Sequence, residues 1–136
     1  MKALLDTGPW VALIDRSEVA HEACVQWFTC FSGELFSTEA VLTEVLYLLN
    51  FSLKAQLAAL DFVIRGVVTL VPSDLHSLHF ARTQMEKYAD LPMDFADATL
   101  VCLAEESGIL NIATLDHKDF SIYRTTDNQV FRILMQ

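Results

Sequence analysis

The sequence has few basic residues, few cysteines and no long apolar run, and each shortage argues against a class of protein. No apolar stretch approaches the roughly 20 residues that cross a bilayer, so we expect no membrane association. The start, MKALLDTGPW, is interrupted by Asp6 and no small-residue cleavage site follows, so we do not expect a signal peptide. Cys24, Cys30 and Cys102 show no CxxC spacing. They are expected to be buried thiols of a cytoplasmic protein rather than a zinc site or a disulfide framework.

Lysine and arginine are scarce. The chain has nine of them against 18 aspartates and glutamates, which gives a net charge of −9. The nine are scattered, whereas a protein that holds nucleic acid through counterion release needs a basic patch. A nucleic-acid binder that works by charge alone is therefore disfavoured. An enzyme whose cations are bound metals stays open, because metal turns a carboxylate cluster into a site that attracts phosphate.

The length and the 53% apolar content favour one α/β domain over residues 1–136, with apolar surface left for a subunit interface. Short apolar runs alternate with segments of helical periodicity, which predicts a parallel sheet covered by helices on both faces. Strands are expected at 2–5, 34–37, 67–71, 109–114 and, weakly, 129–134. Helices are expected from Pro9, at 18–31, at 39–49 after a Thr38 cap, at 53–65 between a Ser52 cap and Gly66, from a Ser73 cap to residue 88, at 94–107 before Gly108, and as a turn or short helix at 116–120.

Three aspartates follow predicted strands. Asp6 ends the first apolar strand, where an unpaired carboxylate is costly. Asp116 and Asp119 come after the strand predicted at 109–114. Because ligands of parallel sheets collect beyond the carboxyl ends of the strands, these acids are candidates for a shared site.

Three further acids lie on predicted helices. Glu44 interrupts an otherwise apolar segment, and Asp94 and Asp97 are three apart at a helix start, so they share a face. Asp97 is flanked by apolar residues, which suggests that it faces inward. Acids drawn from distant segments suit hard cations such as Mg²⁺ or Mn²⁺, which prefer oxygen ligands and activate phosphate and water.

Each acid also has a simpler interpretation. Asp94 is placed to cap a helix, Asp119 to cap a turn, and Glu44 to lie on a solvated stripe. Asp6 can begin a turn with its side chain bonded to the amide of Gly8. The metal-site prediction therefore depends on the order and context of the acids together.

That order resembles the PIN domain, and within it the VapC-like toxin ribonucleases of type II toxin–antitoxin pairs. The matching segments are LLDTGPWVALID at 4–15, TEAVLTEVLYLL at 38–49, DFADATLVCLAEESG at 94–108 and IATLDHKDF at 112–120. Together they span essentially the whole chain. The resemblance implies a single PIN-like domain over 1–136, a three-layer α/β/α fold with a central, mostly parallel sheet.

The resemblance also implies an activity, that of an endoribonuclease that hydrolyses RNA phosphodiester bonds with Mg²⁺ or Mn²⁺. It assigns Glu44 a catalytic role without metal binding. The implied catalytic metal ligands are Asp6, Asp97 and Asp116, with supporting positions at Thr7, Asp94, Thr114 and Asp119.

Two protein partners are implied as well. The apolar circumference of the helix at 53–65, with the resemblance, predicts a symmetric homodimer through this helix and part of 73–88. The resemblance further implies an antitoxin whose tail fills an apolar groove and presents Arg or Lys to the acids. Val45 and Leu48 are expected to contact that tail.

Two other functions stay open. The first is a PIN-like regulatory or binding module without nuclease activity, since ligands alone do not establish catalysis. The second is a phosphatase or phosphotransferase with Asp6 as nucleophile, as in haloacid-dehalogenase-like enzymes. Those enzymes carry a second Asp two residues later, where this chain has Gly8, which argues against it.

Overall fold

Five parallel strands form the centre of the computed structural model, which describes residues 1–135. The order across the sheet is β3-β2-β1-β4-β5, so the first strand of the chain lies in the middle. Apart from Lys2, every residue of β1 is buried, as expected for a strand covered on both faces. The strands are β1 (Lys2–Leu5), β2 (Glu34–Ser37), β3 (Val68–Leu70), β4 (Asn111–Ala113) and β5 (Arg132–Ile133).

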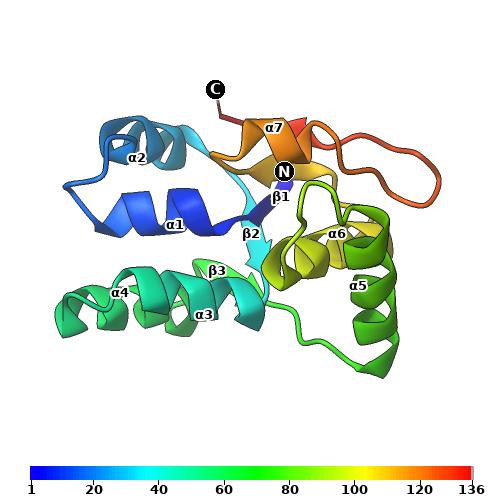
Figure 1. The fold of residues 1–136 in the computed structure, drawn as a ribbon. Helices are drawn as coiled ribbons and strands as arrows, with labels where there is room; N and C mark the ends of the chain where they lie inside the picture. Colours follow the sequence, from blue (N-terminus) through cyan, green and yellow to red (C-terminus); the bar gives the residue numbers. More distant parts are fainter. Residues whose placement is uncertain (136) are drawn as a thin grey trace.

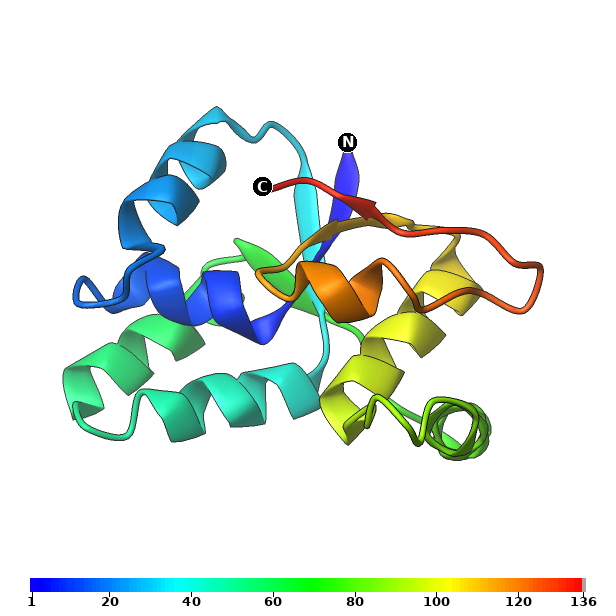
Figure 2. The same cartoon turned by 45° about the horizontal axis from the view of Figure 1, so that its top comes forward.

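Helices cover both faces of this sheet, which confirms the predicted three-layer α/β/α fold. Figures 1 and 2 show α1 to α4 on one side of β1, and α5 and α6 on the other. None of the helices within residues 1–135 is long and apolar enough to span a membrane. The helices are α1 (Thr7–Ile14), α2 (His21–Cys30), α3 (Glu39–Leu48), α4 (Leu53–Ile64), α5 (Leu75–Lys87), α6 (Phe95–Ser107) and α7 (His117–Phe120).

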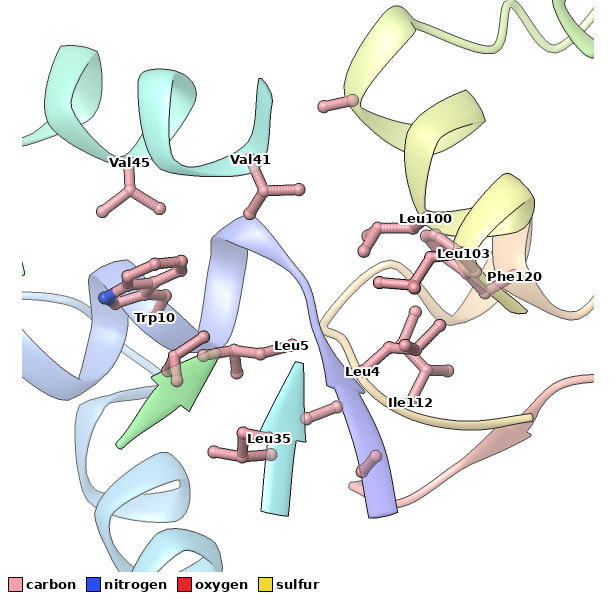
Figure 3. Packing of buried hydrophobic residues seen from close by; sticks show 14 of the residues in the cluster. Leu4, Leu5, Trp10, Leu35, Val41, Val45, Leu100, Leu103, Ile112 and Phe120 are labelled. Atoms are coloured by element: carbon pink, nitrogen blue, oxygen red, sulfur yellow. The ribbon is translucent and has the colours of Figure 1, made fainter. Parts of the chain in front are cut away.

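The apolar residues of β1 point alternately into the two helical layers (Figure 3). Leu5 faces Trp10 of α1, while Leu4 lies with Ile112 on the side of α6 and α7. All three side chains are fully buried, and so is Trp10. The sheet therefore supplies two cores, and the carboxyl end of β1 is held between them.

One partner-facing prediction is wrong. Val45 is fully buried and lies above Trp10 in Figure 3, so it belongs to the core and cannot contact a partner. Leu48, three residues later, is about half exposed. Both are apolar residues of α3, and the packing of the helix against its neighbours, α1, α4 and α6, distinguishes them.

Several boundaries and environments also differ from expectation. Asp74, not Ser73, caps α5, because its carboxylate accepts from the amide of Ser77 while the Ser77 hydroxyl accepts from the amide of Asp74. Strand β5 is shorter than 129–134, because Val130 instead forms an antiparallel bridge with residue 124. Cys30 is exposed at the end of α2, which corrects the expectation that all three thiols are buried. The Thr38 and Ser52 caps and the left-handed Gly108 are confirmed.

Candidate active site

Strands β1 and β4 pair side by side, and their carboxyl ends bring two of the predicted acids to one edge of the sheet. Leu5 is opposite Ala113, and the amide of Asp6 donates a 3.0 Å hydrogen bond to the carbonyl of Ala113. Asp116 follows three residues after β4 ends. The position agrees with the rule for ligand sites in parallel sheets.

Asp6 is 7% exposed, and protein donors hold both of its carboxylate oxygens. Oδ1 accepts from the amide of Thr7 at 2.8 Å, and Oδ2 accepts from the hydroxyl of Thr114 at 2.7 Å. The simpler interpretation expected the Asp6 side chain to bond to the amide of Gly8. Instead, the side chain caps α1 through the amide of Thr7. Burial raises the pKa of Asp6 to about 6 despite these two bonds. The carboxylate is oriented by its donors but carries a charge that its surroundings disfavour.

Asp97 projects inward from the first turn of α6, as predicted, and is partly buried. The hydroxyl of Tyr123 donates a 3.0 Å hydrogen bond to its Oδ2. Burial is the main cause that raises the pKa of Asp97 to about 8, and the negative charges of Asp94 and Asp6 add to it. Burial and several neighbouring acids therefore act on one carboxylate and disfavour its charge.

Three carboxylates come together where α6 meets the segment after β4. One side-chain oxygen from each of Asp97, Asp116 and Asp119 lies within 4.8 Å of the others. Asp116 caps α7 by accepting from the amide of Asp119 at 3.2 Å, so Asp119 is not the cap. Partial burial and the charge of Asp116 raise the pKa of Asp119. Asp119, predicted only as a supporting position, thus shares this group with Asp97 and Asp116.

Asp94 and Glu44 lie at the edge of this group. Asp94 is exposed and caps α6 by accepting from the amide of Asp97 at 2.8 Å, as its simpler interpretation expected. Glu44 on α3 is partly buried. Burial raises its pKa, and the charges of Asp94 and Asp6 raise it further. Glu44 therefore belongs to the same electrostatic environment although it comes from another helix.

Two threonines accompany the acids. The Thr114 hydroxyl donates to Asp6 and accepts from the amide of Asp116 at 2.9 Å, so one side chain orients both segments. Thr7 is buried next to Asp6, and within residues 1–135 its hydroxyl has no hydrogen-bond partner. An unpaired buried hydroxyl is costly unless a ligand satisfies it. Both threonines are among the supporting positions predicted from the sequence.

The donor set fits a hard divalent cation. Its available oxygens are carboxylates with an unpaired hydroxyl nearby, which is the chemistry that Mg²⁺ and Mn²⁺ prefer over nitrogen or sulfur. The raised pKa values of Asp6 and Asp97 have burial and neighbouring carboxylates as their causes. A bound cation would relieve both effects, because it compensates the charges that burial disfavours.

Tyr123 is the residue of this site that the sequence did not reveal. It lies 26 residues after Asp97, beyond α7, and nothing in its spacing links the two. The one available signal was that a tyrosine follows the acidic pair Asp116 and Asp119 closely in the sequence. A tyrosine so placed can bring its hydroxyl to the carboxylates.

Comparisons with known proteins show the family and the fold. The profile of the PIN domain family matches residues 3–125. VapC20 of Mycobacterium tuberculosis, described as a sarcin–ricin loop cleaving toxin, is 22% identical with a TM-score of 0.79, over 85% of this chain and 91% of its own. VapBC2 of Rickettsia felis, solved with a DNA fragment from its promoter, is 16% identical with a TM-score of 0.63, over 98% of both chains. No curated protein matched the chain. At these identities the two structures show a shared fold.

Proposed function

This chain belongs to the PIN domain family, and from that premise we propose that it is a metal-dependent endoribonuclease, the toxin of a toxin–antitoxin pair. One observation carries the proposal. Carboxylates from the end of β1, the start of α6 and the segment after β4 converge at one edge of the sheet. Such a cluster serves no folding purpose that a few neutral side chains would not serve better, because the charges repel one another.

Asp6, Asp97 and Asp116 are the proposed ligands of Mg²⁺ or Mn²⁺, with Asp94 and Asp119 in support. When bound, such a cation polarises the scissile phosphate and makes a nearby water easier to deprotonate. The donors on Asp6 and Asp97 fix the orientation of the two carboxylates before any ligand arrives. This preorganisation avoids a reorganisation cost during the reaction.

Glu44 is proposed to accept a proton from the attacking water. It lies on α3, outside the group of oxygens formed by Asp97, Asp116 and Asp119. The pKa of Glu44 is raised toward neutral pH, and a general base works best when its pKa lies near the pH of the reaction. The Thr7 hydroxyl is proposed to donate to a phosphate oxygen or to a water at the site.

The partners follow from charge and fold. With a net charge of −9, affinity for RNA must come from cations held at the acids rather than from a basic surface. The same acids would attract Arg or Lys from an antitoxin, which would compete with metal for carboxylate oxygens. We propose a cytoplasmic protein with one domain over residues 1–136 that pairs with a second copy and with such an antitoxin.

The test is cleavage of a labelled single-stranded RNA by the purified chain with Mg²⁺ or Mn²⁺, and with EDTA. We expect cleavage with metal, none with EDTA, and none from Asp6→Asn or Asp97→Asn, because Asn keeps the shape and removes the charge. Asp61→Asn on α4 is the matched control and should cleave like the wild type. If the wild type binds metal and RNA without cutting, the chain is a binding or regulatory module instead.

A further inference from the structure

An open hollow of about 460 Å³ lies beside the carboxylates, between α3 and the start of α6. Its lining combines small apolar side chains and a phenyl ring with two acids and a hydroxyl. The charge of Asp94 raises the pKa values of Asp6, Asp97 and Glu44, so the hollow adjoins the proposed centre of cleavage. The lining residues are Ala40, Thr43, Glu44, Asp94, Phe95 and Ala96.

Phe95 is the unusual member of this lining. Its side chain is 42% exposed, whereas Phe120 and Phe131, two other phenylalanines on this side of the sheet, are buried. Its backbone is held at the first position of α6, because the preceding residue, Asp94, caps the helix through the amide of Asp97. An isolated exposed apolar residue needs no explanation, but this ring lines a concave surface next to acids.

The charges restrict what can enter the hollow. Glu44 and Asp94 repel a phosphate, while their oxygens and the Thr43 hydroxyl accept hydrogen bonds from N–H donors. The occupant should therefore be flat enough to cover a ring, free of negative charge, and supplied with N–H groups at its edge. A nucleobase has these three properties, and in single-stranded RNA it is always within one nucleotide of a phosphate.

We propose that this hollow receives an unpaired base next to the scissile phosphate of RNA, stacked on Phe95, with its N–H edge toward Asp94 or Thr43. The inference rests on the proposed function and adds the feature by which the substrate is read. Proteins recognise single-stranded RNA mainly by stacking splayed bases on aromatic side chains. Stacking is sequence-tolerant, but acceptors at the rim favour a base with exocyclic amine donors over uracil.

The experiment uses the full chain with Mg²⁺ and a single-stranded RNA of ten nucleotides that carries 2-aminopurine at each position in turn. Fluorescence is recorded by stopped flow immediately after mixing, before cleavage. For the wild type we expect quenching at one position adjacent to the cleaved bond. Phe95→Leu should abolish the quenching and weaken binding by at least about fivefold, the lower end of what a lost base stack costs. Phe95→Trp should preserve both.

Phe51→Leu is the matched control, since Phe51 is 65% exposed at the turn between α3 and α4, away from the hollow. It should bind and quench like the wild type. With an abasic site at the quenched position, the wild type and Phe95→Leu should bind the RNA with equal affinity. This comparison isolates the contact between Phe95 and the base, as a double-mutant cycle does.

The inference is overturned if Phe95→Leu quenches and binds like the wild type, if Phe51→Leu loses as much, or if no RNA binds. It is also overturned if Phe95→Leu leaves RNA binding intact and weakens only the complex with a basic protein partner, since the hollow would then be a protein site. Quenching that depends on Phe95 without any cleavage supports the base site and contradicts the nuclease proposal.

Discussion

The hydroxyl of Tyr123 donates a 3.0 Å hydrogen bond to Oδ2 of Asp97, which joins the segment after α7 to the first turn of α6. Tyr123 is fully buried, and its ring packs edge to face against Tyr88 and Phe120 at centroid distances of 5.0 and 5.1 Å. The packing leaves the phenol little freedom. The hydrogen bond therefore fixes the direction of the Asp97 carboxylate rather than following it.

The first prediction removes only this hydroxyl. Tyr123→Phe keeps the ring packing and should weaken Mn²⁺ binding by about 10- to 100-fold, the usual cost of losing a hydrogen bond to a metal ligand. Titration of the chain with Mn²⁺, followed by electron paramagnetic resonance, measures this directly. Tyr88→Phe is the control, because the Tyr88 hydroxyl accepts from the amide of Arg124 and does not contact Asp97. Equal loss of Mn²⁺ affinity in both variants would show that the effect is structural.

The second prediction concerns stability without metal. Burial raises the pKa of Asp6 to about 6, and burial with neighbouring carboxylates raises that of Asp97 to about 8, both from 3.8. Above about pH 4 the native state therefore keeps protons that the unfolded chain has lost. Because stability falls with pH wherever the native state binds more protons, the free energy of unfolding should decrease from about pH 4 to about pH 8 and then level off.

Urea denaturation in EDTA across this range measures that slope. Asp97→Asn should flatten its upper part, between about pH 6 and 8, and should be more stable than the wild type at about pH 8. Asp61→Asn should retain the wild-type slope. Stability that rises with pH in the wild type would contradict the assignment of Asp6 and Asp97 as charges disfavoured by the fold.

The third prediction is the reverse effect of metal. A cation binds only deprotonated carboxylates, so added Mg²⁺ or Mn²⁺ should raise the melting temperature strongly at about pH 8.5 and little at about pH 5. Differential scanning calorimetry at both pH values provides the comparison. A shift of equal size at the two pH values would mean that metal binds elsewhere.

Local signals in the sequence predicted much of this architecture. The Thr38 cap, the Ser52 cap and Gly108 are each determined by neighbouring backbone, and the structure has them as expected. Residues that depend on packing were harder. Val45 and Leu48 are both apolar residues of one short helix, and its packing against neighbouring helices buries one and leaves the other exposed.

The acids of the site show the same division. The alternation of helices and strands indicates a parallel sheet. In such a sheet the carboxyl ends of the strands meet at one edge, and Asp6 and Asp116 therefore lie together there. The approach of Asp119 to Asp97, and the hydroxyl of Tyr123, depend on how the chain folds back after β4. No periodicity encodes such a contact, because it joins segments that share no element.

The last prediction concerns assembly through α4. Leu53, Leu57 and Ile64 lie on one face of this helix and are each at least half exposed, while Ala59 on the opposite face is fully buried. Three large apolar side chains on one solvent-facing stripe favour a subunit interface, and a two-fold axis would use the stripe twice. We expect a homodimer by light scattering at tens of micromolar. Leu57→Lys should convert it to a monomer with unchanged melting behaviour at low concentration.

Leu75→Lys, on the exposed start of α5, tests the second part of the expected interface in the same way. A wild-type particle that stays monomeric would exclude the dimer, and a dimer that survives Leu57→Lys would place the interface on another face.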